Sequence, residues 1–390
     1  MNIQKSLIAL AIGGFGIGMT EFMMMGLLPD IASDLSVSIP EAGYLISSYA
    51  LGVVIGAPLL VLIAGNFPPK KLLIGLMVLF TVFNGLSIIV PSYNLFLVTR
   101  LLSGLPHGAF FGVGAVVAGK LAKQGKEASA IAIMFSGLTF ANIVGIPLGT
   151  YVGQSISWRY SFLIVAAIGL LAILSLIFWM PKIEKNEGEK PKEGLKIFKH
   201  LEPWLVLLIT AVGTGGFFAW FSYITPLLTD VSGFAKSNVT FILMMVGVGM
   251  TIGNYIGGRL ADAISPIKAG TILLFTMVIC LFGIKLVAEN QMLSLVMNFI
   301  TGIVAFSVIA PIQMLMIKSA KGAEMLASAS MQAGFNIGNA LGAFFGGIPI
   351  DNGFGYTSPE VVGAFMAFLG ALICISVMLN RKRVARKYAI

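Results

Sequence analysis

Long apolar runs, separated by short polar stretches, fill the chain from residue 5 to residue 380. A helix needs roughly 20 predominantly apolar residues to cross a bilayer, because each residue adds about 1.5 Å of length. Twelve runs meet this requirement. The pattern therefore predicts an all-α membrane protein with twelve transmembrane helices, at residues 5–28, 42–65, 71–91, 95–119, 127–153, 159–181, 203–228, 237–262, 267–288, 291–317, 322–350 and 357–380.

One long polar stretch, Lys182–His200, is rich in Lys, Glu and Gly and divides the predicted spans six and six. Its mixed charge is typical of a flexible linker. We therefore expect an N-terminal six-helix bundle, a cytoplasmic linker, a C-terminal six-helix bundle and a basic cytoplasmic tail, at residues 1–181, 182–202, 203–380 and 381–390.

The composition agrees with a membrane protein, because 57% of the residues are hydrophobic and only 11% are charged, whereas soluble proteins carry about 25% charge. The net charge of +9 is unevenly placed: 21 of the 25 Lys and Arg residues fall at one set of alternate span ends. The positive-inside rule then predicts a multi-pass protein of the inner (cytoplasmic) membrane with both termini in the cytoplasm. The basic residues thus indicate topology in the bilayer, and no nucleic-acid partner is expected.

An internal repeat relates the two halves. Shifting the chain by 197 residues places Gly52-Val-Val-Ile-Gly56 on Gly249-Met-Thr-Ile-Gly253, and the same shift places Gly137 on Gly334 and Asn142 on Asn339. One register that serves two different pairs of helices indicates duplicated six-helix halves. Such halves, with a site near the membrane midplane, are typical of transporters that work by alternating access.

Charged residues inside the apolar spans are candidates for function. Glu21 lies inside the run Leu7–Leu28, and a carboxyl at membrane depth is costly unless it faces a cavity or a partner. Arg100 lies in the fourth span at about the same distance from the outer membrane surface as Glu21, so the two charges can pair. Pairing favours the ionised carboxyl and burial favours the protonated one, which makes Glu21 a candidate proton carrier. The alternatives are a carboxyl that only ties helices together and an arginine that reaches the headgroups.

His107 follows Arg100 by seven residues, on the same helix face. An imidazole titrates near neutral pH and can relay protons. A neutral histidine that is hydrogen-bonded to another helix is the favoured alternative, in which case His107→Gln should leave transport intact.

Several stretches together resemble the major facilitator superfamily, namely TEFMMMGLLPDIA, SGLPHGAFFGVGA, GIPLGTYVGQSISWRYSF and FAWFSY. Within it, the chain is most similar to the drug:proton antiporter branch and to arabinose efflux permeases of the AraJ type. Arg100-Leu-Leu-Ser-Gly104 is similar to the family motif linked to proton transfer. The resemblance implies two pseudo-symmetric six-helix bundles, transport of a small molecule with protons, and a monomer in the lipid bilayer.

Two further motifs imply conformational roles. Gly145-Ile-Pro147-Leu-Gly149 resembles the antiporter motif of the fifth helix, although Ile146 separates the glycine from the proline. Small residues permit close helix packing, and the proline removes a backbone hydrogen bond. The family's cytoplasmic loop motif is resembled by the set Gly258, Arg259, Asp262 and Lys268. In that motif Gly258 lets helices approach closely, and Asp262 caps a neighbouring helix end or pairs with a basic residue. In the first half, Val61 and Gly65 replace the expected Gly and Asp.

Helical spacing marks candidate substrate-binding faces. Gln332, Asn336 and Asn339 form an amide face on the eleventh span, and Phe217, Trp220 and Tyr223 form an aromatic stripe on the seventh. Asn142 and Gln313 add polar groups near the centre of their spans. Amides bond hydroxyl groups and aromatic faces cover C–H surfaces, so these faces suit a sugar-like solute. Each stripe is equally consistent with interhelix packing.

No phosphate loop, zinc pattern or nucleophile elbow occurs in the sequence, so we expect no enzyme activity and no cofactor, with the proton gradient as the driving force. The function predicted is export of a small sugar or sugar-like solute by a proton-coupled antiporter. A multidrug efflux antiporter, a facilitator or proton symporter that imports a solute, and a non-transporting sensor remain as alternatives.

Overall fold

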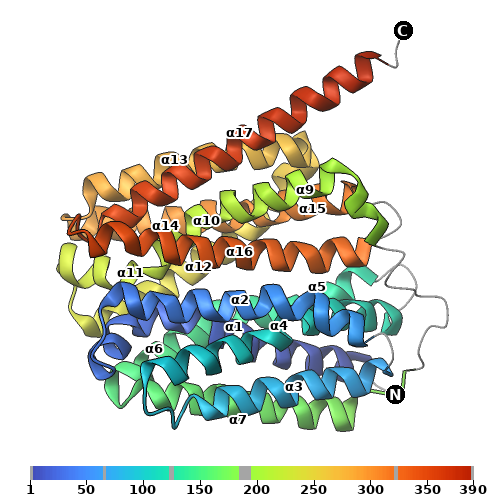
Figure 1. Ribbon diagram of the computed structural model, residues 1–390, viewed down its shortest axis with the longest axis horizontal. Coiled ribbons are helices and arrows are strands. Elements are labelled where there is room, and N and C mark those ends of the chain that lie inside the picture. The colour runs from blue at the N-terminus through green and yellow to red at the C-terminus, as the bar shows by residue number, and fades with distance from the viewer. Residues whose placement is uncertain (1–2, 65–66, 123–126, 184–194, 320–323, 388–390) are drawn as a thin grey trace. The chain divides into compact units, whose positions relative to one another are not determined.

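The protein is described here by a computed structural model, which covers residues 3–64, 67–122, 127–183, 195–319 and 324–387. Within these ranges every regular element is a helix. The first six spans are formed by α1 (Ile3–Asp34), α2 (Ile39–Ala64), α3 (Pro69–Leu86), α4 (Tyr93–Leu121), the series α5 (Glu127–Phe140), η1 (Ala141–Gly145) and α6 (Ile146–Ser155), and α7 (Trp158–Trp179). These helices run from blue to green in Figure 1.

A short 3-10 helix, η2 (Leu195–Lys199), precedes the second set of spans. The seventh span is built from five consecutive pieces, α9 (Leu201–Leu208), η3 (Ile209–Gly213), α10 (Thr214–Ser222), α11 (Ile224–Pro226) and η4 (Leu227–Val231). The remaining spans are α12 (Lys236–Ile264), α13 (Pro266–Val287), the pair α14 (Gln291–Ser307) and α15 (Ile309–Ser319), α16 (Glu324–Asp351) and α17 (Ser358–Lys387). A helix is thus present at each of the twelve predicted spans.

Eleven helices of the described chain are long and apolar enough to cross a membrane. The helix at the remaining predicted span is α16, whose 28 residues exceed the length that a bilayer requires. Its three amides at Gln332, Asn336 and Asn339 lower its mean hydropathy relative to the other spans. A polar face on a long helix is expected where that helix turns part of its surface away from lipid.

The described residues cluster into two compact units, one of residues 1–194 and 235–247 and one of residues 195–234 and 248–390. The first part of α12 therefore belongs with unit 1, where Lys236 forms an ion pair with Asp30 at the end of α1. The predicted domain boundaries at residues 181, 202 and 380 stay a prediction.

Close helix crossings at glycine recur in both units. A methyl group built on Gly52 of α2 would lie 2.0 Å from the carbonyl oxygen of Leu101 on α4, and one on Gly56 would lie 2.0 Å from that of Leu105. In unit 2, Gly253 of α12 meets the carbonyl oxygen of Ile303 on α14 at 1.9 Å by the same measure. Only a residue without a side chain permits such backbone contact. The duplicated crossing is the physical basis of the sequence repeat.

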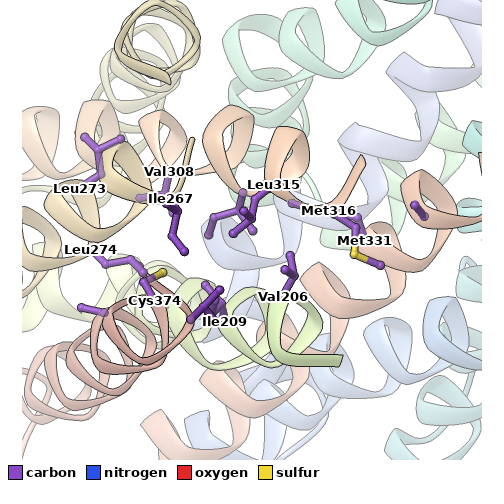
Figure 2. Packing of buried hydrophobic residues seen from close by; sticks show 14 residues of the cluster. Val206, Ile209, Ile267, Leu273, Leu274, Val308, Leu315, Met316, Met331 and Cys374 are labelled. Carbon is purple, nitrogen blue, oxygen red and sulfur yellow. The ribbon is translucent and has the colours of Figure 1, made fainter. Parts of the chain in front are cut away.

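The interior of unit 2 is packed with apolar side chains from six helical elements, α9, η3, α13, α15, α16 and α17. Figure 2 shows Val206, Ile209, Leu274 and Cys374 meeting between α9, η3, α13 and α17, and residues of α15 close the cluster. In a bilayer, lipid is as apolar as these side chains, so their contribution comes from van der Waals packing more than from burial away from water. The pair α13 and α17 lies side by side along this cluster (Figure 1).

Candidate functional site

The buried charges of unit 1 lie together between α1, α2 and α4. Glu21 is 2% exposed and Arg100 is fully buried. Glu21 interacts electrostatically with Arg100 and with Tyr49 of α2. The sequence predicted the proximity of the two charges, whereas Tyr49 was missed because nothing in the sequence indicates which residues a tyrosine in an apolar span contacts.

Arg100 is held mainly by neutral groups. Its Nη1 donates to Thr20 Oγ1 at 3.1 Å, and its Nε donates to the carbonyl oxygen of Leu45 at 3.5 Å. The guanidinium carbon lies 4.2 Å from the centre of the Tyr49 ring, in cation–π geometry. These contacts place the guanidinium in the protein interior, so the alternative in which Arg100 reaches the headgroups is not what the structure shows. A fully buried arginine needs such partners to offset the loss of water.

His107 lies seven residues, or about two helical turns, after Arg100 on α4 and is 2% exposed. Its Nδ1 is 3.2 Å from the hydroxyl of Tyr49, and its ring packs against the Phe111 ring at 5.4 Å between centroids. Tyr49 therefore touches both Arg100 and His107. A hydrogen bond to another helix is the arrangement that the non-relay alternative requires, and a proton-relay role for His107 stays a prediction.

The antiporter-like motif of the fifth span contains a π-helical turn. Five residues, Ala141–Gly145, form η1 directly before Ile146 and Pro147. A proline cannot donate to the preceding turn, and a π-turn absorbs the missing hydrogen bond and the ring. The fifth span is therefore irregular directly before the proline of this motif. Gly145 and Gly149 face Met19 of α1, where an added methyl group would lie 3.3 and 3.1 Å from the nearest atoms, so both permit close packing.

Asn142 lies inside this π-turn and is 2% exposed, and its Oδ1 has no hydrogen-bond partner among the described residues. An amide oxygen in this state is available to a donor group of a solute. Its proposed role in substrate binding is consistent with this geometry and stays a prediction.

The aromatic stripe of the seventh span is fully packed within unit 2. The indole nitrogen of Trp220 donates to Asn298 Oδ1 of α14 at 3.0 Å, and the hydroxyl of Tyr223 donates to the carbonyl oxygen of Ala343 on α16 at 2.7 Å. The Phe217 ring packs edge-on against the Phe306 ring of α14, with 5.6 Å between the ring centroids. These are contacts of interhelix packing, the alternative that the sequence left open. A substrate role for Phe217, Trp220 and Tyr223 stays a prediction.

The amide face of α16 is divided between packed and available groups. Asn336 donates to the carbonyl oxygen of Gln332 at 3.0 Å, while its Oδ1 has no partner among the described residues. Asn339 is fully buried, and neither its nitrogen nor its oxygen has a hydrogen-bond partner in the described chain. A buried amide without partners costs several kcal/mol, on the order of 2–7. Asn339 is therefore the best-supported solute-binding candidate in unit 2. Gln332 and Gln313 are half-buried.

The cytoplasmic loop motif differs from expectation at its glycine. A methyl group on Gly258 would meet nothing within 4 Å, so the expectation that Gly258 allows close helix approach is wrong; Gly253 and Gly257 make that approach instead. Gly257 directly precedes Gly258 and Gly253 precedes it by five residues, so both lie on a different face of α12 from Gly258. Arg259 stacks on Tyr255 at 4.4 Å, and Lys268 lines a surface pocket with Thr271 and Met378. The side chains of Asp262 and of Val61 in the first-half motif, and residue Gly65, lie outside the described positions.

A second buried carboxyl was missed by the sequence reasoning. Glu360, in the first turn of α17, is 1% exposed, and its Oε2 has no hydrogen-bond partner within the described residues. It interacts electrostatically with Lys285 near the end of α13, whose side chain is exposed. Its position next to a predicted loop made it look like a solvated charge in the sequence.

Comparisons with known proteins agree with this architecture. The chain is 40% identical to the putative transporter AraJ of Escherichia coli K12, over 94% of this chain and 93% of that protein. It is 42% identical to the inner membrane transport protein YdhP of the same strain, over 96% of both chains. It is also 26% identical to a chloramphenicol resistance protein of Streptomyces lividans, over 93% of this chain and 94% of that protein.

The first two of these relatives are named as transporters, in agreement with the expectation from the sequence that this chain is not an enzyme. Residues 10–330 match the family model of the Major Facilitator Superfamily. That match spans well over half of the chain, and it includes the buried charges of unit 1. The predicted fold, two pseudo-symmetric bundles of transmembrane helices, is the fold of this family. The chain belongs to the Major Facilitator Superfamily of membrane transporters.

Proposed function

We propose that this transporter exports a small sugar or sugar-like solute in exchange for protons, by alternating access. Glu21 takes up a proton from the outer side and releases it on the cytoplasmic side, and Arg100 biases that exchange. The observation that carries the proposal is a carboxyl that is 2% exposed beside a fully buried guanidinium, in a helix that spans the membrane. Such pairs in a bilayer interior are costly and mark ion or proton pathways.

The proposed setting is a bacterial inner membrane, with both termini in the cytoplasm. It is supported by the distribution of Lys and Arg along the chain and by the name of the relative YdhP as an inner membrane transport protein. The transporter works as a monomer in lipid, takes its energy from the proton gradient without a cofactor, and has a small molecule and protons as its partners.

The solute class is inferred from the available hydrogen-bonding groups. Asn142 and Asn339 present amide atoms without partners among the described residues, and both groups are neutral. Neutral amides suit hydroxyl groups better than ions, which favours a sugar-like solute. A neutral drug with hydroxyl and amide groups is the second candidate, and the relative named for chloramphenicol resistance favours it.

The test uses purified protein in liposomes that hold a preformed pH gradient and a pH-sensitive dye. Addition of L-arabinose, or of chloramphenicol for the drug alternative, should dissipate the gradient, and Glu21→Gln should abolish that signal. Glu360→Gln is the matched control, because it neutralises another carboxyl that is 1% exposed and should leave the signal unchanged. Solute movement that is independent of the gradient would refute proton coupling. Uptake into whole cells that rises with an imposed inward proton gradient would instead identify an importer.

A further inference from the structure

Three side chains from three helices form a hydrogen-bonded chain that ends on Arg100. The Asn84 amide nitrogen on α3 donates to the carbonyl oxygen of Phe80 at 2.8 Å. Its Oδ1 accepts from Thr20 Oγ1 of α1 at 2.6 Å. Thr20 Oγ1 in turn accepts from Arg100 Nη1 of α4 at 3.1 Å. Asn84, Thr20 and Arg100 are all fully buried.

The chemistry of these groups allows only one direction for the chain. The Phe80 carbonyl can only accept, so the Asn84 nitrogen must face it and the Asn84 oxygen must face Thr20. A hydroxyl has a single hydrogen, and Thr20 uses it toward Asn84. The lone pairs of Thr20 Oγ1 are thereby left for the arginine. Asn84 therefore sets Thr20 as an acceptor, although Asn84 itself does not contact Arg100 in the described hydrogen bonds.

These hydrogen bonds hold the guanidinium of Arg100 through the neutral side chains of Thr20 and Asn84, which we call the neutral anchor. Glu21 directly follows Thr20 in the sequence. The other described supports of Arg100 are the carbonyl oxygen of Leu45 and the ring of Tyr49. Nη2 has no hydrogen-bond partner among the described residues. A buried arginine that loses the Thr20 acceptor must compensate elsewhere, and the nearby anion is the carboxylate of Glu21. Loss of the anchor should therefore draw Arg100 toward Glu21 and favour the ionised carboxyl.

We propose that Thr20 and Asn84 are positioning residues that hold Arg100 and thereby set the pH at which Glu21 binds its proton. The titratable groups that interact with Glu21 are Arg100 on α4 and Tyr49 on α2. His107 on α4 contacts Tyr49. The neighbours from α3 and α7 at this level, Asn84 and Phe162, carry no charge. Residues 128–145 of α5 and η1, which pack on α1, contain no ionisable side chain.

The experiment is an infrared pH titration of the protonated carboxyl band in purified protein reconstituted in liposomes, with the Glu21 band identified by its loss in Glu21→Gln. Thr20→Val and Asn84→Leu should each lower the midpoint by about one pH unit, because a closer cation favours the carboxylate. Thr20→Ser, which keeps the hydroxyl, should titrate like the wild type. The double variant should shift no further than Thr20→Val alone, since both residues act through one anchor.

Thr81→Val is the matched control: it removes a hydroxyl of α3 that only bonds its own helix, at the carbonyl oxygen of Met77, and should leave the midpoint unchanged. An unshifted midpoint in Thr20→Val, or additive shifts in the double variant, would overturn the inference. The inference rests on the proposed function for the importance of Glu21, but the titration needs no solute. Loss of solute-driven proton movement with the shift intact would reject the proposed function alone, and the reverse result would reject only the positioning chain.

Discussion

The glycine crossing between α2 and α4 makes a prediction about stability that can be worked out from the structure. A methyl group at Gly56 would lie 2.0 Å from the carbonyl oxygen of Leu105 and 2.5 Å from its Cα. Cβ atoms do not approach heavy atoms of another residue within 3.0 Å in real structures. Gly56→Ala must therefore increase the distance between α2 and α4 at this point by about 1 Å. Backbone atoms cannot rotate aside as a side-chain tip does. Both helices must therefore shift.

The expected cost of Gly56→Ala is about 1–3 kcal/mol or more, because overpacking in a tight interior typically has that magnitude. The intrinsic preference of helices for Ala over Gly opposes it by about 1 kcal/mol. Gly75 of α3 provides the matched control, since a methyl group there would meet nothing within 4 Å. Gly75→Ala should thus leave stability unchanged or raise it slightly, so that the two substitutions of the same chemistry have opposite signs.

The assay is thermal unfolding of the purified variants in one detergent, followed by tryptophan fluorescence at a fixed heating rate. Gly56→Ala should show a clearly lower apparent midpoint than the wild type, and Gly75→Ala should not. Gly253→Ala, at the corresponding crossing of unit 2, should resemble Gly56→Ala because its methyl group would lie 1.9 Å from the carbonyl oxygen of Ile303. Equal midpoints for Gly56→Ala and Gly75→Ala would refute the close-packing argument.

Two further predictions concern buried hydrogen bonds. Asn298→Leu should lower the unfolding midpoint, because it leaves the indole nitrogen of Trp220 buried without its acceptor, at a cost of about 1–3 kcal/mol. Solute-driven proton movement should keep its pH profile in this variant. A changed pH profile with unchanged stability would contradict this prediction. His107→Gln should retain transport in the liposome assay, because an amide can still bond the hydroxyl of Tyr49, while His107→Leu should lower the unfolding midpoint; loss of transport in His107→Gln would instead support a relay.

Much of the fold could be predicted from the sequence, because the property that decides it is local. A run of about 20 apolar residues must form a helix in lipid, where backbone groups have no other partners. The helix at α1 extends beyond its predicted span at both ends, to Ile3 and Asp34, since a helix continues into the interface after the apolar run stops. The η1 interruption was also foreseeable, since Pro147 removes a backbone donor within a predicted span.

The candidate site was less predictable because its hydrogen bonds join residues that are far apart in the chain. Thr20 and Asn84 are separated by 64 positions and Thr20 and Arg100 by 80. Nothing in the sequence indicates which distant residue a threonine or an asparagine in an apolar span hydrogen-bonds. For the aromatic stripe, the periodicity correctly placed Phe217 and Trp220 on one helix. It did not reveal that α14 of the same unit already packs against these two side chains.

The two units share a backbone arrangement but differ in the chemistry at one corresponding position. At the glycine crossings, Leu101 of α4 corresponds to Phe299 of α14 and Leu105 to Ile303, a shift of 198 residues that is one more than the shift relating α2 to α12. The same shift of 198 places Arg100 on Asn298. Asn298 again bonds a side chain from the first span of its unit, since it accepts from Trp220. The duplicated fold therefore kept a polar contact between the same two helices, charged in unit 1 and neutral in unit 2. A neutral pair at this position cannot change its charge with pH. Under the proposed proton coupling, the charged pair at the duplicated position therefore belongs to unit 1.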